Sequence, residues 1–369
     1  MDKAERGSVS KQLKRWKPGG GYKLPLRALA SKKSCKGWRR ELCLPEEPRS
    51  SEEAAFPLAF LLLVDEDPEQ AIRLFELIYQ PQNTYCITYD LNHAQASAAV
   101  LESLGRCHGN VLLPRVQERM WWGSFGVLAA AVNCLRTLAA SKRKWHYVQV
   151  LSWNDGPLRT NLEMVRILGL HRGANDAQLH LLPKVQVEKN QYGRIQEIPM
   201  PKGGNYIQLL DRYKDPPPGN LTIYKGSFSA TLSRSTVEHM LYSRLGQDFF
   251  HWLNDTLVAD ESYWSTMVHN PGIPGYFPGS WSTGSCVFGV GDLSQSLATA
   301  PQLFAHKFYP NYQPAAWHCL ASRIRSRTVN PDPHFPLHLY EQLPAVRYAK
   351  DSNLTCQQLS FSDYFTIPN

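Results

Sequence analysis

The sequence predicts an α/β protein with a mostly parallel central sheet and helices packed on its faces. Three observations support this prediction. Residues 58–64 form a continuous apolar run of strand length, which is typical of a strand buried on both faces. Strand-like and helix-like segments alternate from residue 58 to residue 170, as in βαβ units. The 369 residues are 43% hydrophobic and 11% aromatic, a composition typical of a globular protein.

The elements are expected in a regular first half and a less regular second half. The strands are short apolar and β-branched runs, expected at residues 58–64, 85–89, 111–113, 147–152, 221–224 and 228–232. The helices have apolar residues at helical spacing and are expected at residues 69–78, 94–104, 124–140, 161–168, around 235–257 and 261–268. Pro-rich loops interrupt the second half at residues 215–218 and 271–278.

Composition divides the chain into three segments. Residues 1–54 are rich in Gly, Pro, Lys, Arg and Ser and are expected to form a basic, poorly ordered stem. Residues 55–325 form the expected catalytic domain, and residues 326–369 a C-terminal extension packed on it or trailing it. Much of the net charge of +8 lies in the stem, which raises the alternative of nucleic-acid binding. No nucleic-acid-binding signature follows the stem, so we expect no nucleic-acid partner.

Targeting signals give a mixed indication of compartment. No apolar run approaches the roughly 20 residues that cross a bilayer, and the polar N-terminus does not resemble a signal peptide. Sequons at Asn220, Asn254 and Asn353 permit N-glycosylation in the secretory route. Eight cysteines without metal-binding spacing also favour an oxidising lumen. The sequence leaves this conflict open.

Several common chemistries lack their motifs. There is no GxGxxG after the first strand, no GxxxxGK[ST] and no GxSxG, which argues against classical dinucleotide, P-loop and hydrolase sites. Asp65-Glu66-Asp67 has the form of a DxD metal clamp. We interpret it as a coincidental loop sequence and expect no metal site.

The most informative residues are two adjacent acids, Asp260 and Glu261, between an apolar-faced helical run and Trp264. A carboxylate beside apolar surface is costly to ionise, so its pKa can rise toward the range useful for a general base. The alternative is that both acids only begin a helix, where carboxylates are favoured.

A set of motifs in one order and spacing carries a family resemblance. The motifs lie at residues 56–60, 78–87, 133–135, 160–163, 226–227, 260–264 (Asp260-Glu-Ser-Tyr-Trp264), 286–293 and 303–308 (Leu303-Phe-Ala-His-Lys-Phe308). Over roughly residues 35–320, the chain resembles the core-2/I-branching β-1,6-N-acetylglucosaminyltransferases, glycosyltransferase family 14. The resemblance implies a GT-A-like variant fold.

The resemblance also implies a reaction. It is the inverting transfer of GlcNAc from UDP-GlcNAc to a hydroxyl of an O-glycan acceptor on a glycoprotein, without a metal cofactor. Glu261 matches the family's catalytic base, and Lys307 matches the lysine that neutralises the departing diphosphate. Without a metal, such fixed cations must stabilise the leaving group.

The resemblance assigns further residues to the two substrates. Donor contacts fall on Leu63, Asp65, Asp90, Trp122 and Asp155, although carboxylates at strand ends also cap turns. Acceptor contacts fall on Lys189, Gly226 and Ser227.

The resemblance pairs Cys86 with Cys134 and Cys35 with Cys107; free thiols are the alternative in a reducing compartment. It also implies a Golgi lumenal domain on a type II membrane anchor. No anchor is visible in this sequence.

Several positions depart from the family pattern. Thr283 stands where the family has a second diphosphate-binding arginine, and Phe277 where it has a paired cysteine. Segment 268–285, which in the family carries an aromatic platform for the acceptor sugar, is short. Acceptor contacts near residues 178–189 are only partly kept, as Gln178, Gln186 and Lys189, and Asp65 and Trp122 replace a histidine and a tyrosine.

Two interpretations follow from these departures. A basic residue from elsewhere can take the place of the missing arginine, with Arg234, His306 and Arg323 as the candidates. Alternatively, the chain is a weak or inactive relative that binds glycan or nucleotide, or acts through protein partners.

Overall fold

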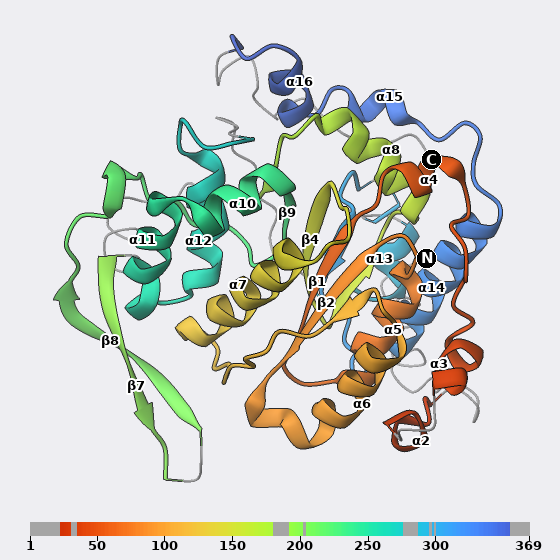
Figure 1. Cartoon of the computed structure of the whole chain (residues 1–369), viewed down its shortest axis with the longest axis horizontal. Helices are drawn as coiled ribbons and strands as arrows, with labels where there is room; N and C mark the ends of the chain where they lie inside the picture. The colour runs from red at the N-terminus through yellow and green to blue at the C-terminus, as the bar shows by residue number, and fades with distance from the viewer. Residues whose placement is uncertain are drawn as a thin grey trace, which may run out of the picture.

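The computed structural model describes residues 23–30, 35–179, 192–201, 204–275, 287–294, 297–298 and 300–354. A six-stranded sheet forms its centre (Figure 1). Its order is β3 (Val111–Leu112), β2 (Thr84–Tyr89), β1 (Ala59–Val64), β4 (Tyr147–Ser152), β9 (Ala230–Ser233) and β6 (Asp176–Ala177). The predicted α/β fold with a mostly parallel central sheet flanked by helices is confirmed.

The sheet contains a topological switch point between β1 and β4. The first four strands are parallel, and β1 pairs with β2 on one side and with β4 on the other. The chain therefore moves outward through β2 and β3 and then returns to the opposite side of β1. Ligands of open α/β sheets bind beyond the carboxyl ends of the strands at such a point. β9 is antiparallel to β4 and extends the sheet away from it.

Each face of the sheet carries its own core, because alternate residues of β1 point to opposite faces. Phe60, Leu62 and Val64 pack with α5 (Pro68–Ile78), α6 (Ala94–Cys107), α8 (Asn161–His171) and α14 (Pro314–Val329). Ala59 and Leu61 pack with α7 (Phe125–Ala140), α10 (Arg234–Tyr242), α11 (Arg244–Trp252) and α12 (Ala259–His269). All six residues of β1 are buried, as the continuous apolar run predicted.

The expectation of a poorly ordered segment 1–54 is wrong for its described part. Residues 23–54 include helices α2 (Leu26–Ala30), α3 (Cys35–Leu42) and α4 (Ser51–Ala55). Trp38 is fully buried, and its Nε1 donates to Ser103 Oγ of α6 over 3.2 Å. Apolar residues spaced among the basic ones anchor this segment, a pattern that composition alone conceals.

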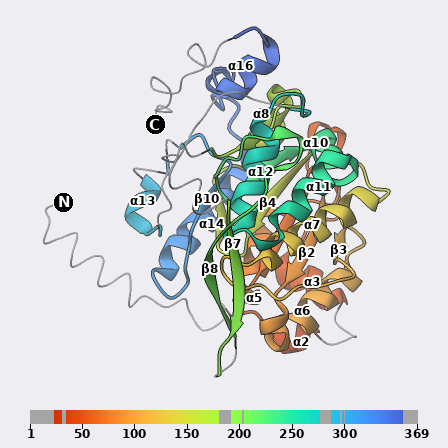
Figure 2. The ribbon, with the colours of Figure 1, turned by 90° about the vertical axis from the view of Figure 1, so that its left-hand side faces the viewer.

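The second half differs from the predicted elements in three places. Residues 221–224 do not form a strand, and the helix expected around residues 235–257 is interrupted at Ser243, which caps α11 by accepting from Gly246 N. A long hairpin of β7 (Gly193–Pro199) and β8 (Asn205–Tyr213) was not predicted, and it extends away from the central sheet (Figures 1 and 2). Its two strands pair only with each other and not with the central sheet, so the alternation of strands and helices did not indicate them.

The C-terminal part packs back onto the domain. A small antiparallel sheet pairs β5 (Asp155–Pro157) with β10 (Phe304–His306). The remaining helices are α13 (Val290–Ser294), α15 (Leu337–Tyr340) and α16 (Pro344–Lys350). Tyr340 is fully buried, and its hydroxyl accepts from Arg159 Nε over 2.5 Å. Within the described residues, no helix is both long and apolar enough to cross a membrane.

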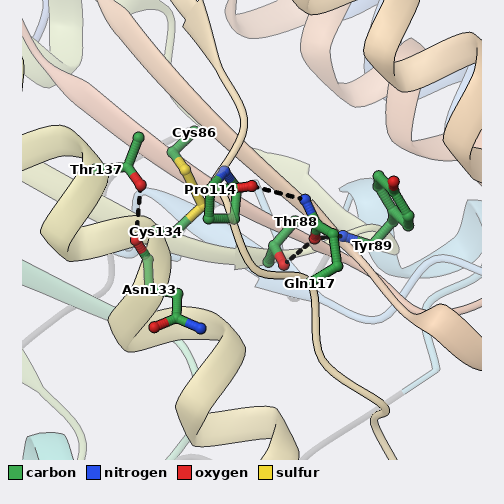
Figure 3. The surroundings of a disulfide bond; sticks show 8 residues. All are labelled: Cys86, Thr88, Tyr89, Pro114, Gln117, Asn133, Cys134 and Thr137. Carbon is green, nitrogen blue, oxygen red and sulfur yellow. Dashed lines mark hydrogen bonds between the residues drawn. A yellow bond between two sulfur atoms is a disulfide. The ribbon is translucent and has the colours of Figure 1, made fainter.

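Both predicted disulfides are present. Cys35 bonds to Cys107, which joins α3 to α6, and Cys86 bonds to Cys134, which joins β2 to α7. Next to the second bond, Gln117 Oε1 accepts from Thr88 Oγ1 and Tyr89 N over 2.8 and 3.0 Å (Figure 3). The disulfide and Gln117 therefore fix the carboxyl end of β2 against α7 and the loop that follows β3.

Candidate functional site

Several predicted site residues that the structure describes lie at the switch point of the sheet or on segments joined to it. Asp65 follows β1, Asp90 follows β2 and Asp155 follows β4. Glu261 lies in the first turn of α12, and Lys307 follows β10. Hydrogen bonds through two short segments, residues 118–123 and 225–229, link these ends into one site.

Segment 225–229 connects α12 with Asp155. Gly226 N donates to the backbone oxygen of Glu261 over 2.8 Å, and Ser229 Oγ donates to Asp155 Oδ2 over 3.4 Å. Ser229 N donates to Ser227 Oγ over 3.2 Å, which closes a turn between them. Because an extended residue spans at most about 3.6 Å, the three steps from Gly226 to Ser229 cover no more than about 11 Å. Glu261 and Asp155 therefore belong to one site.

The carboxylate of Glu261 forms an ion pair with Lys225. Lys225 Nζ lies 2.7 Å from Glu261 Oε2, and both side chains are 30% exposed. The pair is therefore accessible to a ligand, and the ammonium holds the carboxylate in one orientation. Lys225 was not among the predicted site residues, although its position directly before the Gly226-Ser227 motif is a signal that could have identified it.

Gly226 allows this approach of two backbones. A Cβ atom on residue 226 would lie 1.9 Å from Gln178 O and 2.0 Å from Ser265 Oγ. Only glycine fits without a shift of one of these neighbours. The predicted acceptor residues Gly226 and Ser227 thus belong to the segment beside Glu261. Gln178, which directly follows β6, packs against Gly226.

Asp260, the other acid of the pair, is buried rather than presented to solvent. Its side chain is 6% exposed, and burial together with the Glu261 charge raises the pKa of Asp260 to about 7. The two adjacent acids therefore have different environments. Glu261 is accessible and paired with a cation, whereas Asp260 is protonated over part of the physiological pH range.

Asp155 is buried and holds a histidine next to Lys307. Its Oδ2 accepts from Ser152 N over 2.8 Å, and its Oδ1 lies 2.6 Å from His306 Nδ1. The antiparallel register of β5 and β10 sets Asp155 opposite His306 and so brings two distant segments together. The sequence indicated Asp155 and His306 as candidate residues, but it did not indicate that their side chains are in contact.

Lys307 is half-buried, and its backbone is fixed on both sides. Its carbonyl accepts from Phe288 N over 3.0 Å, and the next residue, Phe308, donates to Asn154 O over 2.8 Å. In the described part of the chain, no carboxylate pairs with the Lys307 ammonium. Its charge is therefore available to an anionic group.

Asp90 positions the loop that follows β3. Its carboxylate is 1% exposed, and Oδ1 accepts from Asn92 N and Met120 N, each over 2.9 Å. Oδ2 lies 3.1 Å from His93 Nδ1. The turn-capping alternative therefore describes the contacts of Asp90 in this structure, and the residue fixes the start of segment 118–123.

Segment 118–123 runs from Asp90 to α12 and carries Trp122. Val258 N donates to Gly123 O over 3.0 Å directly before α12, which ties the segment to the helix of Glu261. The Trp122 side chain is 80% exposed, an unusual state for an indole. Leu63 is 5% exposed and packs with Met120 and Ala130, so it holds this segment against the sheet.

The acids of the DxD-like sequence have separate environments. Asp67 caps α5, where its Oδ1 accepts from Glu69 N and Gln70 N, each over 3.0 Å. Burial raises the pKa of Asp65, and its Oδ1 is buried without a hydrogen-bond partner among the described residues. Across the described residues, no cluster of three or more His, Cys, Asp or Glu is arranged to hold a metal ion.

The candidates for the missing arginine lie in different places. His306 is at the site, in contact with Asp155. Arg234 is at the opposite end of the strands, where it pairs with Glu238 and stacks on Trp145. Arg323 projects from α14 and donates to Leu293 O of α13 over 3.2 Å. Only His306 of the three is in contact with a predicted site residue in the described structure. Lys189, Gln186, Phe277 and Thr283 lie outside the described residues.

Comparison with known proteins identifies the class of protein. The family model of the core-2/I-branching enzyme matches residues 58–275. A human N-acetyllactosaminide β-1,6-N-acetylglucosaminyl-transferase is 34% identical over 308 residues, covering 77% of this chain and 76% of the relative. The mouse protein of the same name is 32% identical, with 79% and 82% covered. A human protein named probable β-1,3-galactosyl-O-glycosyl-glycoprotein β-1,6-N-acetylglucosaminyltransferase 7 is 29% identical, with 84% and 78% covered.

The fold and these relatives define a glycosyltransferase-type protein. The chain belongs to the core-2/I-branching enzyme family, as its motifs indicated. The family match includes β1, segments 118–123 and 225–229, and Glu261, but ends before Lys307.

Proposed function

We propose that this chain is an inverting β-1,6-N-acetylglucosaminyltransferase that transfers GlcNAc from UDP-GlcNAc to a hydroxyl of an O-glycan. The observation that carries the proposal is segment 225–229, which links an accessible carboxylate, Glu261, to the group formed by Asp155, His306 and Lys307. One end of the site thus offers a base, and the other offers a cation that pairs with no carboxylate among the described residues. The transferase names of the family relatives support the same reaction class.

In the proposed reaction, Glu261 accepts the proton of the acceptor hydroxyl as its oxygen attacks the anomeric carbon of GlcNAc. The bond from that carbon to the diphosphate breaks on the opposite face, and UDP leaves with the electron pair. Lys307, with its free ammonium, stabilises the charge that develops on the diphosphate. Lys225 keeps the Glu261 carboxylate oriented until the acceptor hydroxyl arrives.

Asp65 and Trp122 are proposed to contact the nucleotide-sugar donor. The half-buried Asp65 offers its carboxyl group to a hydroxyl of the donor, and the exposed Trp122 face covers the nucleotide sugar. We propose that no metal takes part, because fixed cations supply the charge and Asp67 of the DxD-like sequence is occupied in capping α5.

The test is UDP release from UDP-GlcNAc with EDTA present and a panel of O-glycan acceptors. We expect acceptor-dependent turnover in EDTA, and a loss of about 10²–10⁴-fold in kcat for Glu261→Gln, because general base catalysis contributes that much. Glu66→Gln, which changes an exposed acid after β1, is the matched control and should retain activity. Full turnover by Glu261→Gln, or its abolition by EDTA in the wild type, would contradict the proposal.

A second candidate function is binding without turnover. The Lys225–Glu261 ion pair favours it, because an ammonium 2.7 Å away occupies the carboxylate that the transfer reaction needs as its base. Calorimetry with UDP separates the two candidates. Micromolar UDP binding with no UDP release on any acceptor would favour the binding protein.

We propose that the chain works in the Golgi lumen. Its two disulfides support an oxidising compartment, in which such bonds persist. Microscopy of the full chain with a lumenal protease-protection assay tests this location. Exclusive cytosolic staining with reduced cysteines would contradict it.

A further inference from the structure

A groove on the outer side of α7 lies apart from the residues assigned to catalysis. It has a volume of about 700 Å³ and lies between the start of α7, the loop after β3, strand β7 and the short helix η4 (Leu253–Asp255). Neither Glu261, Asp155 nor Lys307 lines it. Its volume falls within the range of ligand pockets.

The lining of this groove combines aromatic and planar polar groups. Phe125 and Phe250 form its apolar part, with ring centroids 4.9 Å apart. Around them, Asn133 Nδ2 donates to Glu118 Oε1 over 2.9 Å, and Arg136 stacks on Phe250 with its Cζ 5.2 Å from the ring centroid. Amides, carboxylates and guanidinium groups beside an apolar floor suit a ligand with many hydroxyls and an apolar ring face, that is, a carbohydrate.

One residue of the groove can carry such a ligand covalently. Asn254 lies in η4, lines the groove and is exposed, and Asn254-Asp255-Thr256 is a sequon. We propose that Asn254 is N-glycosylated and that the inner sugars of this glycan occupy the groove. The inference rests on the lumenal location proposed above.

The structure sets the order of events. Thr256, which the glycosylating enzyme must read, is fully buried, and its Oγ1 accepts from Lys214 Nζ over 2.5 Å. The sequon is therefore readable only before this region folds. Once attached, the glycan starts from a residue of the groove lining, to which Glu197 of β7 also belongs. The sugars thus bridge η4 to the hairpin and to α7.

A second sequon supplies the matched control. Asn220 is also exposed, at the end of η3 (Pro218–Asn220), but it does not line this groove. A glycan at Asn220 therefore adds mass and solubility without filling the groove. Comparing Asn254→Gln with Asn220→Gln isolates the contribution of the groove.

The experiment uses the full chain secreted from animal cells behind a cleavable signal peptide, so that secretion itself proves passage through the lumen. Glycopeptide mass spectrometry should find Asn254 occupied. Hydrogen exchange in β7 and the first turn of α7 should become at least three-fold faster in Asn254→Gln, and remain unchanged in Asn220→Gln. These readouts do not depend on transferase activity, so a protein without turnover still tests the inference.

Two outcomes would overturn the inference. The first is secreted wild-type protein with Asn254 unoccupied. The second is an occupied Asn254 whose removal leaves exchange in β7 and α7 at the wild-type rate. If Asn254→Gln is not secreted, enzymatic removal of glycans from a folded variant with both Asn220→Gln and Asn353→Gln gives the same comparison.

Discussion

Adjacent acidic residues, and adjacent basic residues, have different chemistry in this protein because their surroundings differ. Asp260 and Glu261 are adjacent, yet the first is buried and the second pairs with Lys225 at the surface of the site. Likewise, His306 is engaged by Asp155, whereas Lys307 beside it is free of a carboxylate partner among the described residues. In each pair, the helix or strand that carries the two residues determines which side chain is buried or paired and which is accessible to a ligand.

Removing the Lys307 charge should slow transfer. We expect Lys307→Met to lower kcat by about 10²–10³-fold, the effect of removing one group that stabilises developing negative charge. Initial-rate kinetics of UDP release measure it. Lys144→Met, which changes an exposed lysine near the opposite end of the sheet, should leave kcat unchanged. Equal rates for both variants would remove Lys307 from the mechanism.

The buried Asp260 should make stability depend on pH. Its pKa is raised from 3.8 to about 7 in the folded protein, so the folded state binds the proton more tightly than the unfolded state. The stabilisation is complete below about pH 4 and is lost as pH rises through 7, by an amount on the order of 4 kcal/mol. Asp260→Asn removes this dependence.

Thermal unfolding between pH 4 and pH 8 measures the difference. The Tm of the wild type should fall relative to that of Asp260→Asn as pH rises over this interval. A constant difference across the interval would show that Asp260 does not titrate there.

At the scale of elements, helix termini and strand ends position the site. Helix α12 begins after Val258, which has left-handed backbone angles and donates to Gly123 O. Strand β10 pairs with β5 and so carries His306 to Asp155. Helix α5 begins at a cap supplied by Asp67, which explains one acid of the DxD-like sequence without any metal.

Asp67→Ala tests this reading of the DxD-like sequence. Loss of the cap should lower the free energy of unfolding by about 1 kcal/mol, because two backbone N–H groups of α5 lose their acceptor. Urea unfolding measures this loss. The kcat of transfer should equal that of the wild type, both with and without EDTA. Loss of transfer with an unchanged free energy of unfolding would instead indicate a metal-binding role for Asp67.

For the whole molecule, the two disulfides join the sheet and the N-terminal helices to α6 and α7. The Cys86–Cys134 bond closes a loop of 48 residues. Replacing both cysteines with serine should therefore cost about 2–4 kcal/mol of stability. Calorimetry should find Tm lower by roughly 3–5 °C, because the entropy of unfolding grows with chain length. Cys43→Ser, which changes an exposed free cysteine, should have little effect, and equal Tm values for both variants would contradict the prediction.

Much of the central fold was predictable because local pattern and tertiary structure agree there. The apolar run of β1 is buried on both faces, and the alternation of strands and helices through residue 170 has the predicted order. Prediction failed where stability comes from distant contacts. Trp38 anchors α3 through Ser103, and the β7–β8 hairpin pairs only with itself. The hairpin leaves no strong periodic signal in the sequence, and the apolar spacing of α3 is masked by its many basic residues.

The sequence by itself determined the fold class and the family, because ordered motifs and apolar periodicity are properties of the chain alone. The family resemblance then implied both cysteine pairs. Only the tertiary structure decided which groups meet. It paired Lys225 with Glu261, set His306 against Asp155 and left an oxygen of Asp65 without a partner among the described residues. These contacts join segments far apart in the chain, and their energies depend on distance and burial, which exist only after folding.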